Sequence, residues 1–161
     1  MRRKKHVHLQ SCRTRRKNKF FDEAAYRSAV NYVLDPEKAV YAGGCNVSSV
    51  RLAAQEMEET AMEFGKENGK KVRHSVLSFG EDEHVTPEQA NRFAKKIIEY
   101  YEPDYQMVYA VHANTDDVHI HFVMNHISCA DGHRYQGKKS DYYGFMNHVK
   151  KVTHLPVIPV K

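Results

Sequence analysis

The chain has 161 residues, 41% of them hydrophobic and 28% charged, which is enough for one domain with an apolar core. No apolar run approaches the roughly 18 residues of a membrane span, and the basic start lacks the apolar segment of a secretory signal, so we expect a cytoplasmic protein without membrane insertion. Three widely separated cysteines argue against a disulfide framework or a cysteine zinc site, and the net charge of +5 favours a polyanionic partner.

The N-terminal part of the chain is expected to be a basic arm followed by helices. We expect residues 1–20 to form the arm, with a short strand at Val7–Ser11, and residues 21–161 to form a single domain with further C-terminal domains absent. Apolar residues at helical spacing predict a helix over Asp22–Leu34, ended by a proline. The same pattern predicts a second helix from about Ser49 to Glu67.

The C-terminal part alternates strands and helices. Val72–Phe79 is typical of a strand, and Thr86, Pro87 and Gln89 form a capping box that begins a third helix. We then expect a hairpin of two apolar strands, a helix over about Ser140–Val152 and an apolar tail over Leu155–Val160. This order indicates an α+β fold: a central, mainly antiparallel sheet of about five strands, with helices packed on one face and a ligand-bearing face opposite.

Three histidines stand in the hairpin, where the segment VYAVHANTDDVHIHFVMNHIS begins at Val108. Strand alternation places His112 on one face of the first strand, and His119 and His121 on one face of the second. Residues 113–117, ANTDD, are turn formers and can close the hairpin. The sequence therefore predicts that the three imidazoles converge.

Three imidazoles suit a catalytic metal site, because they leave coordination positions open for water or substrate. The alternative is chance, since the chain has 11 histidines and a lone strand histidine is usually solvated or satisfied in the core. Spacing, face and flanking strands agree for this triple, which favours the metal site.

A metal on a basic domain suggests chemistry at phosphate, for which Tyr32 is the favoured nucleophile. It lies near the end of the first predicted helix, just off the apolar stripe, whereas Tyr26 lies on the stripe and is expected to be structural. A phenol with a pKa of about 10 needs a base or a cation to attack at neutral pH. Ten tyrosines in the chain mean that Tyr32 is a candidate only because of the histidines.

Three segments in order resemble the motifs of the MobP-like relaxase, or mobilisation nuclease, family of the HUH endonuclease superfamily. They are NYVLDPEKA at 31–39, RHSVLSFGEDEHVTPEQA at 73–90 and HANTDDVHIHFVMN at 112–125. The resemblance covers about Ala25–Val152. It departs from the family pattern at Asn114, where many relatives have an aspartate, and at 116–118, where Asp-Asp-Val replaces the usual Asp-His.

The resemblance implies an HUH-like fold and a metal-dependent nickase and strand transferase acting on single-stranded DNA at an origin of transfer of a plasmid or integrative element. Tyr32 would attack a phosphodiester and remain joined to the 5′ phosphate. The metal would be Mg²⁺ or Mn²⁺ in use, although imidazoles favour Zn²⁺ or Ni²⁺. Accessory relaxosome proteins and a coupling protein are the expected partners.

Further residues are candidates for supporting roles. Asp116 or its neighbour Asp117 is expected to orient a ligand histidine or accept the tyrosine proton, with turn formation as the alternative. His74 and Glu83 align with the middle motif and are expected to line the site, with strand packing as the alternative for His74. Phosphate contacts are expected from basic side chains, with solvated surface as the alternative for each: Lys38, Arg73, Lys138 and Lys139.

Three other functions are compatible with these residues. A rolling-circle replication initiator would use the same tyrosine and metal on another DNA target. A non-catalytic nucleic-acid-binding module would hold a structural metal or none. A metallohydrolase would cleave with water and form no covalent intermediate.

Overall fold

The computed structural model describes residues 7–11 and 24–160, so the cations of the predicted basic arm lie outside the described residues. The described strands form one six-stranded sheet in the order β2-β4-β5-β3-β1-β6. All neighbouring strands are antiparallel except β1 and β6. The strands are β1 (Val7–Ser11), β2 (Ala39–Cys45), β3 (Val72–Phe79), β4 (Met107–His112), β5 (His119–Asn125) and β6 (Val157–Val160).

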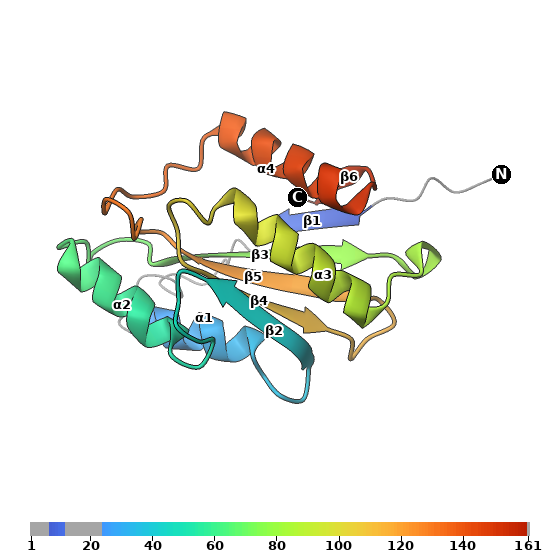
Figure 1. Ribbon diagram of the computed structural model, residues 1–161, viewed down its shortest axis with the longest axis horizontal. Coiled ribbons are helices and arrows are strands. Elements are labelled where there is room, and N and C mark those ends of the chain that lie inside the picture. Colours follow the sequence, from blue (N-terminus) through green and yellow to red (C-terminus); the bar gives the residue numbers. More distant parts are fainter. Residues whose placement is uncertain (1–6, 12–23, 161) are drawn as a thin grey trace.

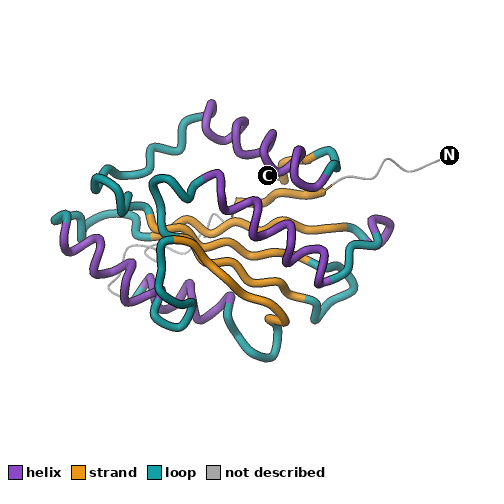
Figure 2. Tube along the Cα trace, viewed as in Figure 1, coloured by secondary structure: helices purple, strands orange, loops and turns teal. Residues whose placement is uncertain are grey.

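Four α-helices pack against the sheet, and two short 3₁₀ helices follow β3 and α3 (Figures 1 and 2). The α-helices are α1 (Ala25–Val33), α2 (Ala53–Glu63), α3 (Pro87–Ile97) and α4 (Lys139–Thr153). The 3₁₀ helices are η1 (Glu81–Glu83) and η2 (Ile98–Tyr100). None of the helices in the described ranges has the length and apolar character needed to cross a bilayer.

The α+β class and the mainly antiparallel sheet are confirmed, whereas two details differ from the sequence-based expectation. The sheet has six strands because 39–45, expected as a connection between helices, forms the edge strand β2. Helices also cover both faces: α3 and α4 lie over one core, and α1 and α2 over another. The second core exists because the histidine-bearing face of the hairpin also carries apolar residues, such as Val108 and Val123.

The capping box of α3 forms as predicted. The Thr86 hydroxyl accepts a hydrogen bond from the Gln89 backbone N–H, and the Thr86 backbone N–H donates to the Gln89 side chain. This end of α3 is therefore fixed where the chain returns from η1 toward the sheet.

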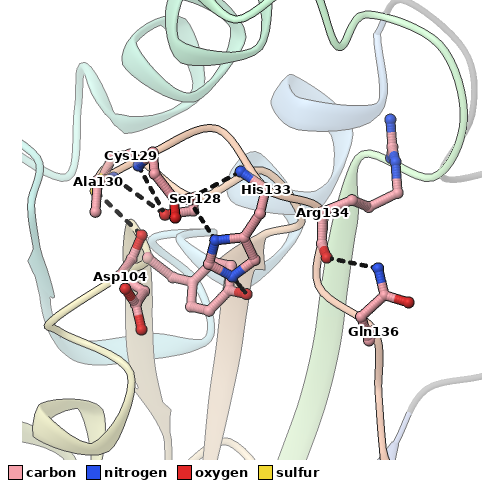
Figure 3. A network of polar contacts seen from close by, with 9 residues as sticks. Asp104, Ser128, Cys129, Ala130, His133, Arg134 and Gln136 are labelled. Carbon is pink, nitrogen blue, oxygen red and sulfur yellow. Dashed lines mark hydrogen bonds and ion pairs between the residues drawn. The ribbon is translucent and has the colours of Figure 1, made fainter.

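The polar loop that follows β5 is a closed turn (Figure 3). The Ser128 hydroxyl accepts hydrogen bonds from the backbone N–H groups of Ala130 and Asp131, at 3.1 and 3.4 Å. The backbone N–H of Cys129 donates to the Asp104 carbonyl at 2.9 Å, which ties the turn to the segment before β4. These polar groups satisfy one another at the end of β5 farthest from His119, so they contribute to folding and lie apart from the three histidines.

The buried His126 gives the fold a testable dependence on pH. Neither of its ring nitrogens has a hydrogen-bond partner within the described ranges, and burial lowers the pKa of His126 to about 3. The unfolded chain, with a histidine pKa of about 6.5, then binds the proton more readily. The unfolding free energy therefore does not depend on His126 protonation above pH 6.5. As the pH falls from 6.5 toward 3, the unfolded chain binds the proton first, and the unfolding free energy decreases by up to about 1.4 kcal/mol per pH unit.

We therefore expect His126→Leu to reduce the slope of unfolding free energy against pH by about 1.4 kcal/mol per unit between pH 6 and pH 4. Urea unfolding followed by circular dichroism at several pH values measures this slope. A slope equal to that of the wild type would mean that His126 takes up its proton equally well in both states.

Candidate active site

The three hairpin histidines converge as predicted. His112, the last residue of β4, lies opposite His119, the first residue of β5, and His121 follows on the same face. The ring centroids are 4.1 to 5.3 Å apart, and one ligand nitrogen from each residue falls within 4.8 Å of the others. The hairpin thus forms a histidine cluster with the dimensions of a metal site.

Burial favours the neutral form of two of these imidazoles, His112 and His121. His112 is 2% exposed and His121 is 7% exposed. Burial lowers the pKa of His112, and it lowers the pKa of His121 to about 2, with His112 adding to the effect on His121. Near neutral pH the two rings therefore carry lone pairs that a metal ion can use.

Backbone carbonyls fix the tautomers of two of the rings. Nε2 of His112 lies 2.7 Å from the Val33 carbonyl, and Nδ1 of His119 lies 3.0 Å from the Asp117 carbonyl. A carbonyl only accepts, so each of these nitrogens carries the hydrogen and donates it. The other nitrogen of each ring, Nδ1 of His112 and Nε2 of His119, then holds the lone pair.

His74 supplies the corresponding partner for His121. It lies on β3, beside β5, and its Nε2 is 2.8 Å from Nδ1 of His121. When His121 donates through Nδ1, its Nε2 is left to bind a metal. Each ring then has one nitrogen held by the protein and one available, which is how metal-ligating histidines are usually oriented. The donor set therefore fits a divalent metal held by three imidazoles.

Tyr32 lies beside this cluster. Its ring makes edge contacts with His74 and His121, at centroid distances of 5.9 and 6.0 Å, and its side chain is 49% exposed. The Lys38 ammonium lies 5.0 Å from the centre of the same ring. Tyr26, by contrast, is 2% exposed and belongs to the core. The structure therefore places Tyr32, and not Tyr26, at the histidines.

Hydrogen bonds at both ends hold α1, which carries Tyr32, on the sheet. Near its start the Tyr26 hydroxyl donates to Oδ1 of Asn125 at 3.2 Å, and at its end the Val33 carbonyl accepts from His112. Asn125 also donates to the Met57 carbonyl of α2 and to Oε1 of Gln106, at 3.1 and 3.0 Å. This fully buried amide therefore joins α1, α2 and β5.

The two predicted acidic residues lie at the same end of the sheet as His119. Asp116 is exposed in the turn between β4 and β5. Glu83 is the last residue of η1, which follows β3 shortly after Ser78, the residue paired with His119. Both are near the histidine end of the strands, and their chemical roles stay predictions.

The four predicted phosphate contacts are divided between two regions. Lys38 is at the tyrosine. Arg73 lies on the opposite face of β3 from His74, where its guanidinium donates to the hydroxyls of Tyr101 and Tyr135 at 3.0 and 2.7 Å. Both phenols in turn donate to Asp141 of α4. The exposed Lys138 and Lys139, at the start of α4, lie near this network and not at the histidines.

Two elements of the site were not assigned from sequence. The Val33 carbonyl gives no sequence signal, because any residue provides a carbonyl. Asn125 did give one: it is an amide placed at the end of an apolar strand run, where a polar side chain must find partners.

Comparison with known proteins identifies the family to which the chain belongs. Residues 32–154 match the family model described as relaxase, MobA/VirD2-like, nuclease domain. The match covers both Tyr32 and the histidine cluster. The chain belongs to this relaxase family.

Individual relaxase relatives are distant and much longer. Protein rlx of Staphylococcus aureus is 30% identical over 111 residues, which are 69% of this chain and 32% of that protein. The group II intron-interrupted relaxase LtrB of Lactococcus lactis subsp. cremoris is 30% identical over 78 residues, 48% of this chain and 13% of that protein. Protein MobA of Acidithiobacillus ferrooxidans is 35% identical over 57 residues, 35% of this chain and 14% of that protein. The matched segments thus span a third or less of the length of these relatives.

Removing the partner of His121 should weaken metal binding without removing a ligand. For His74→Ala we expect a 10- to 100-fold loss of Mn²⁺ affinity in isothermal titration calorimetry, because the His121 ring loses its orienting hydrogen bond. His119→Ala should lose more, and His148→Ala, on the α4 side of the sheet, should change nothing. Wild-type affinity in His74→Ala would show that the hydrogen bond does not prepare the site.

Asn125 should matter more to stability than any one of its partners. Asn125→Ala leaves several buried groups without partners and is expected to cost about 2–4 kcal/mol of unfolding free energy. Tyr26→Phe removes one hydrogen bond and is expected to cost about 1 kcal/mol. Urea unfolding of both variants measures the difference. Equal losses would contradict the assignment of Asn125 as the residue that joins α1, α2 and β5.

Proposed function

We propose that this relaxase domain nicks one strand of DNA at an origin of transfer and transfers that strand during conjugative mobilisation. The carrying observation is the contact of the exposed Tyr32 ring with His74 and His121, beside three histidines that can hold a metal. A tyrosine that could attack a phosphodiester is therefore adjacent to a histidine cluster that could hold a divalent metal ion.

The proposed chemistry is transesterification by Tyr32. Its phenolic oxygen attacks the scissile phosphorus, a phosphorus–oxygen bond to tyrosine forms, and the bond to the 3′ oxygen breaks. The leaving oxygen takes up a proton and becomes a free 3′ hydroxyl, while the 5′ phosphate remains on Tyr32. Attack by another 3′ hydroxyl reverses the step and joins the strand, so no external energy source is needed.

The surrounding residues are assigned supporting parts in this step. A phenol with a pKa of about 10 must lose its proton on attack, and Asp116 and Glu83 are the proposed acceptors, with Asp117 as the alternative to Asp116. Lys38 is proposed to contact the phosphate, because its ammonium already lies at the Tyr32 ring. Arg73, Lys138 and Lys139 are proposed to contact DNA away from the reacting bond.

His112, His119 and His121 would hold the divalent metal ion, for which Mg²⁺ or Mn²⁺ is proposed. When bound, the ion neutralises charge on the scissile phosphate as the bond to tyrosine forms. Three imidazoles also suit Zn²⁺ or Ni²⁺, so a test should include these ions. Other relaxosome proteins and a coupling protein are the proposed protein partners.

The decisive test is the covalent intermediate. We expect wild-type protein with Mn²⁺ to form an adduct with single-stranded oligonucleotides from candidate origins, seen on a denaturing gel when the 3′ end is labelled. Tyr32→Phe should form no adduct while still binding DNA. As a control, Tyr143→Phe alters an exposed tyrosine that lies on α4, away from the histidines, and should form the adduct normally. Cleavage that survives Tyr32→Phe would establish a hydrolase that uses water.

A further inference from the structure

A groove lies beside the candidate active site, between α1, the edge strand β2 and the start of α2. It has a volume of about 810 Å³, within the roughly 300–1,000 Å³ of pockets that hold small organic ligands. Ala39, one of its lining residues, is paired across the sheet with His112. The groove therefore begins one strand spacing from the histidine cluster, about 5 Å.

Each of the two walls of the groove carries one guanidinium and one carboxamide. Arg27 and Asn31 stand one helical turn apart on α1, whereas Arg51 lies in the turn before α2 and Gln55, four residues later, in the first turn of α2. All four side chains are exposed. Gln55 Nε2 donates to Glu59 at 3.0 Å, which leaves its carbonyl oxygen as an acceptor. The described residues that line the groove include no carboxylate.

The floor of the groove is apolar, with Val30 of α1 and Leu34, which directly follows α1, among its residues. Guanidinium groups bind phosphate, carboxamides pair with base edges, and an apolar floor receives the faces of unstacked bases. A lipid or a peptide would use the floor but would not need two guanidiniums, and a free anion would not need the floor. The combination fits unpaired nucleotides.

We propose that this groove binds unpaired nucleotides of the DNA strand next to the scissile phosphate, with the arginines on its phosphates and the carboxamides on its bases. Asn31 directly precedes Tyr32 in α1, so the helix that presents the nucleophile also forms one groove wall. The groove thereby contributes to the choice of the bond that Tyr32 reaches. This inference rests on the proposed function, in that DNA is the substrate.

Binding can be tested separately from cleavage. The full chain is titrated into a fluorescein-labelled 30-nucleotide single strand of mixed sequence, in EDTA so that no nicking occurs, and fluorescence anisotropy is read at several salt concentrations. Arg27→Ala with Arg51→Ala should lower the salt slope by about 1.4, and the affinity at 0.1 M salt by about 25-fold, because each phosphate contact contributes about 0.7 to the slope.

The matched control removes two cations from the other face of the sheet. Arg92→Ala with Lys95→Ala, both exposed on α3, should change affinity by less than about 3-fold. A second pair of variants tests the bases: Asn31→Ala and Gln55→Ala should change the relative affinities for oligo(dA), oligo(dC) and oligo(dT) while leaving the salt slope unchanged.

The possible results test the groove inference separately from the proposed nicking function. If the groove and control variants weaken binding equally, or neither does, the groove inference is wrong and the nickase proposal stands. If the arginine variant instead changes the oligomeric state measured by light scattering, with DNA binding intact, the groove holds a second copy of the chain and the inference is also wrong. A wild-type protein that binds no single strand would overturn both.

Discussion

The placement of α1 on the histidine-bearing face of the sheet is the constraint on which the candidate site depends. The proposed nucleophile and the proposed metal ligands come from segments about 80 residues apart in sequence, so only tertiary packing can bring them together. Two hydrogen bonds fix the helix lengthwise, one from Tyr26 to Asn125 and one from His112 to the Val33 carbonyl. The second of these belongs to a proposed metal ligand, so the same contact that ends the helix also orients His112. Fold and site therefore share an interaction and would be lost together.

Burial of the histidines carries a cost that the structure offsets locally. A buried polar nitrogen without a partner destabilises the fold, and here His112, His119 and His121 each have one nitrogen bonded to a protein group. The remaining nitrogen of each ring would be satisfied by a metal ion bound among the three histidines. Because burial also lowers the pKa of His112 and His121, protons compete weakly with a metal near neutral pH. The fold therefore holds the histidines in a form that could bind a metal ion.

Sequence periodicity was sufficient to predict the histidine hairpin. It was insufficient to predict a strand where tertiary packing overrides the local preference of the residues. Alternation placed the histidines on one face because a strand has no other way to arrange neighbouring side chains. The strand β2 was missed because its segment, AVYAGGC, contains two adjacent glycines, which disfavour strands. In the structure Tyr109 of the neighbouring β4 lies over Gly43, where an added Cβ would come within 2.7 Å of the ring. The tyrosine fills the space that the missing side chain leaves, a long-range contact that no local pattern reveals.

The helices α1 and α2, which cover the histidine-bearing face of the sheet, explain where the candidate site is open to solvent. On the histidine-bearing face of β3, Val72 and His74 are buried, whereas Val76 and Ser78 are partly exposed. Coverage by α1 and α2 therefore stops part-way along the strand, and the histidine cluster lies at that boundary. A site wholly under the helices would exclude a nucleic-acid strand, and one wholly outside them would leave the imidazoles hydrated and unoriented. The apolar residues that share a face with the histidines thus determine how far the helices extend, and so how much of the histidine cluster is accessible from solvent.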